Sequence, residues 1–455
     1  MTFPRYADYK DSGIEWLGEV PAHWEQKPIK HVSTISYGIA EPPQYKDSGT
    51  PLIRATNIHE GKIFNKDFAF VNPDDIPSSK IIWLSPGDII VVRSGAYTGD
   101  SAIILDEHCP SIAGFDMVLR IKTCHPMFMQ YALLSQYIKK YQIDIEKIRA
   151  AQPHINANEL GKCFALIPPL PEQTAIAAFL DHETGKIDAL VTEQEKLIAL
   201  LKEKRQAVIS HAVTKGLDPS VSLKDSGIEW LGEVPEHWEV VPIKYYTSSI
   251  EQGWSPQCEG FPVETAEEWG VLKVGCVNGG VFNPLENKTL PEDLEPIPSL
   301  GITVGDLLIS RANTKELVGG AAVAHANYPR LMLCDKLYRL RLDKTTVLPD
   351  FIVSFLGTGL ARGQIELAAT GASSSMQNIG QGTILGMATP LPPLPEQTAI
   401  VAYLDAQTAK FDALTAEAER AIALLKERRS ALISAAVTGK IDVRGFVAPT
   451  SQEAA

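Results

Sequence analysis

Apolar residues recur at heptad-like spacing through residues 171–214. The series is Ile176, Leu180, Ile187, Leu190, Leu197, Leu201, Val208 and Ala212, with Gln194 as one polar interruption. Such spacing is typical of a coiled-coil seam. Pro171 and Glu172 suit the first turn of a helix, and Gly216 stands where the helix should end. The pattern therefore predicts one long helix.

A second seam lies within residues 395–440, and Gly439 stands near its end. It comprises Phe411, Leu414, Ala418, Ala421, Leu425, Leu432 and Ala436. Two equivalent seams in one chain predict that the helices pair with each other, and pseudo-two-fold symmetry would make the pairing antiparallel. The alternative is that each helix packs only against its own domain.

Outside the seams, short β-branched runs alternate with Gly, Pro and Asn. The predicted strands are Asp88–Val92, Ser101–Leu105, Val118–Lys122, Asp306–Ser310 and Leu337–Leu342, with helices near 126–140 and 350–362. This mixture predicts an α+β fold of two domains with mainly antiparallel sheet, separated by the two long helices.

The chain is an internal duplication. KDSGIEWLGEVPAHWE at 10–25 recurs at 224–239 with one difference, Ala22 against Glu236. The other near-identical pairs are 168–181 with 392–405 and 197–214 with 421–438. Tryptophans in the first pair of blocks could stack on nucleic-acid bases, but anchoring the segment on its domain is the favoured interpretation.

The regions between these blocks resemble each other faintly but in the same order. The similar segments are 51–64 with 271–282, 86–95 with 304–313, and FDMVLRI at 115–121 with CDKLYRL at 334–340. We expect the two globular regions to share a fold and to present different surfaces. Because segment 1–25 corresponds to 216–239, the architecture is expected to be cyclic.

These boundaries predict five parts. They are a first domain at 1–170, which includes block 10–25, a first helical region at 171–215, a second domain at 216–394, which includes block 224–239, a second helical region at 395–440, and a disordered tail at 441–455. The length of 455 residues agrees with two to four domains.

Composition narrows the class of protein. No apolar run approaches the ~18 residues needed to cross a bilayer, and the N-terminus lacks the features of a signal peptide. Six scattered cysteines without CxxC pairs favour free thiols in a reducing cytoplasm over a metal site. The net charge of −13 argues against a nucleic-acid partner. That objection weakens because residues 26–170 sum to +1 and residues 240–394 to −4.

Motifs for catalysis are missing from the sequence. It contains no GxGxxG, GxxxxGK[ST], HExxH or GxSxG, and its carboxylates and histidines form no metal-ligand pattern. The sequence therefore predicts a protein that is not an enzyme, with no catalytic residues, no metal and no cofactor bound by this chain.

The recurrent motifs SGIEWLGEVPxHWE, PPLPEQTAI and LLKExRxxxIxxAVTxxxD resemble those of type I restriction–modification specificity (S) subunits, from end to end of the chain. The resemblance implies two target-recognition domains, each binding one half of a bipartite, asymmetric site in double-stranded DNA. It also implies helices that set the spacer and dock two modification (methyltransferase) subunits, with restriction subunits as further partners. S-adenosylmethionine, ATP and Mg²⁺ are expected in those partner subunits. The heptad core, Ile187 to Ala212, would span roughly 39 Å at ~1.5 Å per residue, about one turn of B-DNA.

Arginine–guanine and Asn/Gln–adenine contacts are the expected modes of base recognition. In the first domain the candidates are Arg54, Asn57, Arg93, Tyr97, Gln152, His154 and Asn156. In the second they are Lys273, Asn278, Arg311, Asn313, Ser374, Gln377 and Asn378. Arg54/Lys273 and Arg93/Arg311 keep their charge in both copies, so they could bind phosphate instead.

Two alternatives remain open from the sequence. One is an S-type subunit of another bipartite restriction–modification class, serving methylation only. The other is a duplicated adaptor or glycan-binding scaffold that does not bind DNA, which the net charge favours mildly.

Overall fold

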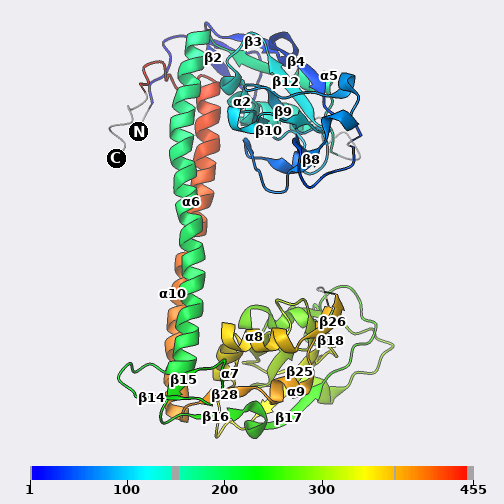
Figure 1. The fold of residues 1–455 in the computed structure, drawn as a ribbon, viewed down its shortest axis with the longest axis vertical. Helices are drawn as coiled ribbons and strands as arrows, with labels where there is room; N and C mark the ends of the chain where they lie inside the picture. Colours follow the sequence, from blue (N-terminus) through cyan, green and yellow to red (C-terminus); the bar gives the residue numbers. More distant parts are fainter. Residues whose placement is uncertain (1–2, 42, 146–152, 374–375, 448–455) are drawn as a thin grey trace. The chain divides into compact units, whose positions relative to one another are not determined.

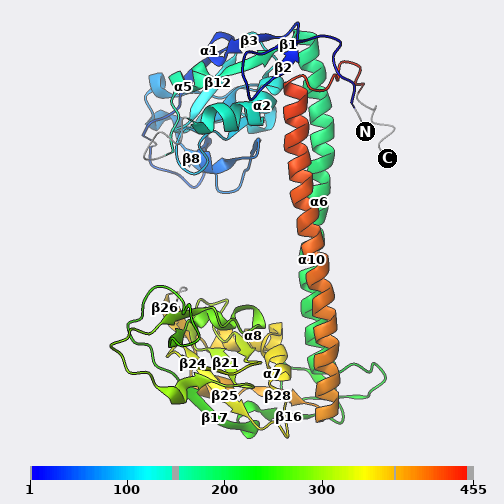
Figure 2. The ribbon, with the colours of Figure 1, turned by 180° about the vertical axis from the view of Figure 1, so that it is seen from behind.

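A computed structural model describes residues 3–41, 43–145, 153–373 and 376–447. The chain forms two compact units, residues 1–195 with 419–455 and residues 196–418. Each unit holds one globular domain and a part of both long helices, and within each unit these two helix parts run side by side in both views (Figures 1 and 2).

The main sheet of the first domain has four antiparallel strands in the order β10-β9-β12-β4. Their bounds are Ser33–Tyr37 (β4), Ile89–Val91 (β9), Ser101–Ile103 (β10) and Met117–Ile121 (β12). On β9, Ile89 and Val91 join the core formed with the helices, whereas Ile90 joins a second core. Side chains alternate across a strand, so this unbroken apolar run is buried on both faces.

A smaller sheet in the order β11-β5-β8 contains one parallel pair, β5 with β11. Its strands are β5 (Thr50–Ile53), β8 (Ala69–Val71) and β11 (Ile112–Ala113). Three further strand pairs are antiparallel: β6 (Ile58–His59) with β7 (Lys62–Ile63), β1 (Tyr9–Asp11) with β2 (Glu19–Pro21), and β3 (Glu25–Pro28) with β13 (Phe164–Ile167). The helices of this domain include α1 (Ile29–Val32), α2 (Pro126–Leu134), α3 (Gln136–Ile138), the π-helical turn η5 (Lys139–Ile143) and α5 (Ala157–Lys162).

The second domain repeats this plan. Its antiparallel sheet β23-β21-β25-β17 consists of β17 (Thr247–Gln252), β21 (Leu307–Ser310), β23 (Ala321–Val323) and β25 (Leu337–Leu342). The smaller sheet, β19 (Asn287–Thr289), β18 (Gly270–Leu272), β24 (Tyr328–Met332) and β20 (Gly301–Ile302), again has one parallel pair, β18 with β24. The expected common fold of the two globular regions is therefore confirmed.

Other elements complete the second domain. They are β14 (Leu223–Asp225) with β15 (Glu233–Pro235), β16 (Glu239–Pro242) with β28 (Ala388–Leu391), β22 (Ala312–Asn313), β26 (Thr370–Ser373), β27 (Met376–Asn378), α7 (Pro349–Leu356), α8 (Gly359–Ala368) and α9 (Gln381–Leu385).

Strand register corrects one equivalence drawn from the sequence. Leu119 pairs with Ile89, and Leu340 pairs with Leu307, so Arg120 corresponds to Arg341 and not to Arg339. Arg120 binds Asp88, and Arg341 binds Asp306 in the same way, each through Nε at 3.0 Å. Compared with the sequence alignment, the second copy has two extra residues before β25, so the alignment is out of step with the strand pairing by two positions. Side chains alternate with a period of two, so a shift of two leaves the apolar pattern unchanged and the sequence comparison does not detect it.

Both long helices form as predicted, as α6 (Leu170–Lys215) and α10 (Leu394–Val437). In the first unit, Nε of Arg429 lies 3.0 Å from Oδ1 of Asp188. In the second unit, Nη1 of Arg205 lies 2.6 Å from Oδ1 of Asp412. The two copies are offset by 224 residues in this region, so the pair Arg205–Asp412 is equivalent to the pair Arg429–Asp188. An antiparallel helix pair with pseudo-two-fold symmetry requires such equivalent pairs.

The predicted seam is wrong in part. Leu190, Leu197 and Leu414 are exposed. The buried positions near the helix start, such as Ile176 and Leu180, join the core of the globular domain. Packing against the domain therefore buries the helix ends, and the apolar seam between the helices is narrower than the spacing predicts.

Near-identical blocks anchor the helices to the domains. Glu172 accepts hydrogen bonds from Nε1 of Trp24 and from His23, each at 2.8 Å, and Trp24 is buried. Its repeat Glu396 binds His237 at 2.8 Å beside buried Trp238. Trp24 and Trp238 are thus anchors, as favoured from the sequence.

The adjacent glutamines reinforce this arrangement. The side-chain carbonyl of Gln173 accepts from the backbone N–H of His125, just before α2. Gln397 likewise accepts from Leu348, just before α7. The Glu–Gln pair of PPLPEQTAI therefore joins each long helix to a short block and to a domain helix.

The expectation of a disordered tail is wrong for its first residues. The backbone N–H of Asp442 donates to Pro4 at 2.8 Å, and Phe446 meets Phe179 edge to face with ring centroids 5.3 Å apart. Aromatic burial against α6 fixes this segment. The predicted disorder of 448–455 concerns residues outside the described ranges.

Candidate nucleic-acid interface

In the first domain the turn that follows β9 meets the segment that precedes α5. The backbone N–H of Ile155 donates to Arg93 at 2.9 Å, and Ser94 forms a β-bridge with His154. The hydroxyl of Thr98 donates to Pro153 at 3.2 Å. Two groups of candidate residues about 60 positions apart in sequence are therefore neighbours.

The second domain makes the same junction with different side chains. The backbone N–H of Ile379 donates to Arg311 at 3.0 Å. Strand β22 then pairs with β27, so that Ala312 faces Asn378 and Asn313 faces Gln377. Each domain thus brings its two candidate segments to one equivalent place.

Arginines in the first domain lie over aromatic rings. The guanidinium of Arg93 lies 3.7 Å from the ring centroid of Phe115 and 4.8 Å from that of Tyr37. Arg54 lies 5.3 Å from the ring centroid of Tyr45 and donates through Nη2 to the carbonyl of Asp67 at 2.9 Å. Cation–π contact restricts each guanidinium plane before any ligand arrives.

A pocket of about 180 Å³ lies beside Arg54; Tyr45, Arg54, Ser94, Phe115 and Asp116 are among its lining residues. Oδ1 of Asp116 accepts from the backbone N–H of Arg93 at 3.1 Å. Burial raises the pKa of Asp116, against the lowering effect of that hydrogen bond. The carboxylate orients the arginine backbone at the cost of desolvation.

Two candidates have side chains that hydrogen-bond within the fold. Asn57 is buried; its Oδ1 accepts from the N–H of Arg54, and its Nδ2 donates to carbonyls of residues 64 and 66. Asn156 caps α5 by accepting from the N–H groups of Asn158 and Glu159. Local hydrogen bonds therefore occupy the whole amide of Asn57 and the amide oxygen of Asn156, which sequence spacing cannot reveal.

The counterpart of Asn57 also needs correction. Asn57 accepts from the N–H of Phe64, and Cys276 accepts equivalently from Asn283. Cys276 therefore takes the place of Asn57, and burial raises its pKa. Asn278 lies two residues later, in an exposed turn at the position of His59. Lys273 precedes η7 (Val274–Gly280) as Arg54 precedes η1 (Ala55–Asn57).

Amides dominate the junction of the second domain. Nδ2 of Asn313 is buried without a hydrogen-bond partner in the described structure, while its Oδ1 accepts from the N–H of Thr314 at 2.9 Å. Gln377 and Asn378 are partly exposed beside it. Arg311 donates through Nη1 to the carbonyl of Asp335 at 3.3 Å.

Of the remaining candidates, Tyr97 is exposed, and its ring centroid lies 6.0 Å from that of His59. Gln152 and Ser374 lie outside the described residues. Sequence reasoning missed Tyr37, Tyr45 and Phe115, which hold the arginines. The signal available was aromatic residues in polar loops, but only the fold places them beside Arg54 and Arg93.

In the described ranges, His, Cys, Asp and Glu side chains form no group suited to holding a metal ion. Over the same ranges, no helix has the length and apolar character needed to span a membrane.

Several known proteins are similar in sequence to this chain. No family model matches. The chain is 26% identical over 441 residues to the type I restriction enzyme EcoKI specificity subunit of Escherichia coli, covering 93% of this chain and 90% of that protein. It is 24% identical over 447 residues to the StySPI specificity subunit of Salmonella potsdam, with the same coverages.

A solved structure shares the fold. It matches with a TM-score of 0.69 at 19% identity, covers 93% of this chain and 99% of its own, and was described in work on assembly and conformational transition of the type I R-M system. Duplicated α+β domains joined by two paired helices define the class of protein. Over nearly its whole length, the chain is similar to type I restriction enzyme specificity subunits.

Proposed function

We propose that this chain is the DNA-reading, non-catalytic subunit of a type I restriction–modification complex, and that each domain binds one half of a bipartite, asymmetric site. One observation carries the proposal. The junction after β9 and the junction after β21 occupy the same place in a common fold, yet beside the shared arginine one presents aromatic rings and the other presents Asn313 and Gln377. Two domains with the same backbone fold and different exposed side chains are suited to recognising two different DNA sequences.

The chemistry of the junctions suggests what each reads. Arginine forks suit guanine O6 and N7, and Asn or Gln amides suit adenine N6 and N7. Arginine occupies the same position in both copies, as Arg93 in the first and Arg311 in the second, so we assign phosphate contact to this position. His154, Asn378 and Gln377 differ between the copies and are assigned to base edges.

The repeated frame suits identical partners. The pair Glu172 with His23 and its repeat, Glu396 with His237, occur one in each unit, and such repeated surroundings would offer two equivalent docking places to two modification subunits. The helices would set the spacer between the half-sites. S-adenosylmethionine, ATP and Mg²⁺ would be bound by the modification and restriction subunits, with this chain supplying none of their ligands.

The test is co-expression with candidate modification subunits, followed by sequencing of methylated adenines. We expect one modified motif of two unlike halves with a fixed spacer. A stable complex that modifies no bipartite motif would overturn the proposal.

A further inference from the structure

One turn differs sharply between the two copies. In the first domain it is His59–Lys62 between β6 and β7; in the second it is Asn278–Val281. A backbone hydrogen bond spans each turn, from Phe64 to Asn57 in the first and from Asn283 to Cys276 in the second, so the turns are equivalent. Both turns place their second and third residues at positive φ. Backbone geometry is shared, so the difference lies in the side chains.

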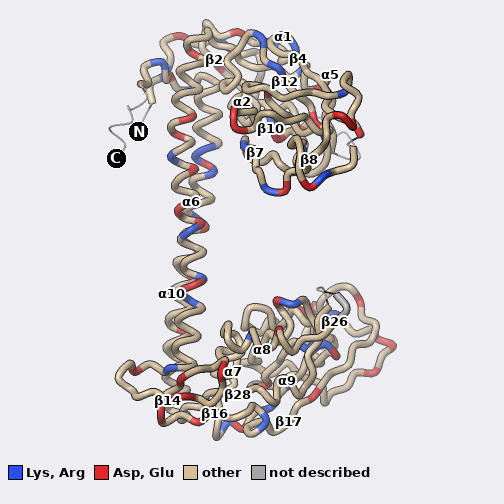
Figure 3. Tube along the Cα trace, viewed as in Figure 1, with Lys and Arg blue, Asp and Glu red and all other residues tan. Residues whose placement is uncertain are grey.

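In the first unit this turn is tied to both long helices. Nζ of Lys62 lies 2.8 Å from Oδ2 of Asp188 on α6, and Nζ of Lys426 on α10 lies 3.4 Å from Oε1 of Glu60. Asp188 also binds Arg429 at 3.0 Å, so one carboxylate joins the turn and both helices. Figure 3 shows both signs of charge along the helices.

The same turn contacts the loop proposed to read DNA. Nδ1 of His59 lies 4.0 Å from Oδ2 of Asp100, whose carboxylate also pairs with Lys139. The ring of His59 meets that of Tyr97 nearly edge to face. A continuous set of polar contacts therefore leads from the helix pair through the turn to loop 93–100.

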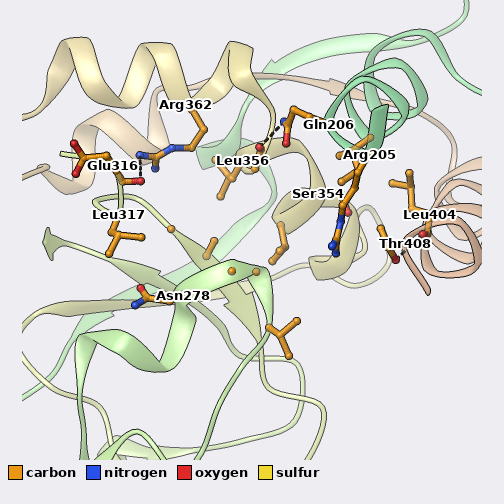
Figure 4. A pocket seen from close by; sticks show the side chains of 18 of the residues that line it. Arg205, Gln206, Asn278, Glu316, Leu317, Ser354, Leu356, Arg362, Leu404 and Thr408 are labelled. Atoms are coloured by element: carbon orange, nitrogen blue, oxygen red, sulfur yellow. Dashed lines mark hydrogen bonds between the residues drawn. The ribbon is translucent and has the colours of Figure 1, made fainter. Parts of the chain in front are cut away.

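In the second unit the corresponding side chains are missing. Gly279 stands for Glu60 and Val281 for Lys62, although Lys202 and Asp412 repeat Lys426 and Asp188. A groove of about 440 Å³ separates the turn from the helices, with Asn278 on one wall and Arg205, Gln206 and Thr408 on others (Figure 4). Within the described residues, no ion pair joins this turn to either helix.

We infer that Glu60 and Lys62 form an ionic latch, defined as the pairs Glu60–Lys426 and Lys62–Asp188, which positions loop 93–100 for reading the first half-site only. The inference rests on the proposed function, because loop 93–100 is assigned there to DNA. Glu60 and Lys62 are positioning residues that act through the loop.

The latch can be removed by giving the first turn the residues of the second, Glu60→Gly with Lys62→Val, in the full chain bound to its modification subunits. Both pairs are half exposed and individually weak. We expect amide hydrogen exchange in 58–64 and 93–100 to become roughly three- to tenfold faster, as loss of two such pairs allows. Exchange in 277–282 and 311–320 is the internal control and should not change.

Charge exchange separates the latch from general damage. Glu60→Lys alone should speed exchange in 93–100, and Glu60→Lys with Lys426→Glu should restore it. The reciprocal variant, Gly279→Glu with Val281→Lys, should slow exchange in 277–282 by engaging Lys202 and Asp412.

The functional readout is methylation of sites carrying one mismatch. With the latch removed, mismatches in the first half-site should be tolerated more often, whereas discrimination at the second stays constant. Unchanged exchange in 93–100, no rescue by charge exchange, or equal loss at both half-sites would each overturn the inference. Failure of the proposed function would appear separately, as no bipartite motif with the unaltered chain.

Discussion

The first and second domains have the same sheet order, the same parallel pair in the smaller sheet and the same Asp–Arg pair beneath the main sheet. They differ where the strands end. The first domain holds arginines against aromatic rings, and the second holds amides on a short β-ladder. The two domains thus share the packing of their sheets but differ in their exposed side chains at the strand ends. The comparison teaches that side chains differ most where the hydrophobic core does not depend on them.

The largest expected effect comes from exchanging a whole domain. Replacing residues 26–167 with a foreign recognition domain should change one half of the modified motif completely and leave the other half and the spacer unchanged. Sequencing of methylated adenines measures this. A change in both halves would mean that the two domains do not read independently.

Lengthening the helices should alter the spacer alone. Inserting four residues near 192–195, with a matching insertion in α10 to keep the pair in register, adds about 6 Å at ~1.5 Å per residue. We expect the spacer to grow by one or two base pairs, as measured on the same methylation map. An unaltered spacer would show that the helices are not the ruler.

The arginines common to both domains should act without regard to sequence. Arg93→Ala and Arg311→Ala are each expected to weaken DNA binding by the complex and to lower the slope of log K against log salt by about 1, as loss of a phosphate contact does. Titration at several salt concentrations measures the slope. If Arg93→Ala instead relaxes the motif at one base, it reads that base.

The repeated anchors should differ in strength. Glu172→Ala leaves Nε1 of buried Trp24 unpaired, which costs about 1–3 kcal/mol. Glu396→Ala should cost less than about 1 kcal/mol, because Glu396 is partly exposed and binds His237 without pairing Nε1 of Trp238. Urea unfolding of both variants gives the comparison, and equal losses would contradict it.

Particular residues show how far sequence reasoning reached. The long helices and their ends, the strands around Ile89 and Leu307 and the anchoring role of Trp24 were predictable, because each rests on local periodicity or exact repetition. The candidate site was predictable only as a set of segments. The structural roles of Asn57 and Asn156 were not predictable, because hydrogen bonding to nearby backbone is a tertiary and capping property that residue type does not disclose.

By itself the sequence determined that the chain is a duplication with a common frame and two unlike surfaces, since identity and difference between copies can be read directly. Only the tertiary structure decided which side chains meet. The contacts of Arg93 with Phe115 and Tyr37, and of Lys62 with Asp188, join residues from distant parts of the chain. Such contacts depend on how sheets and helices pack, and packing is set by the whole core.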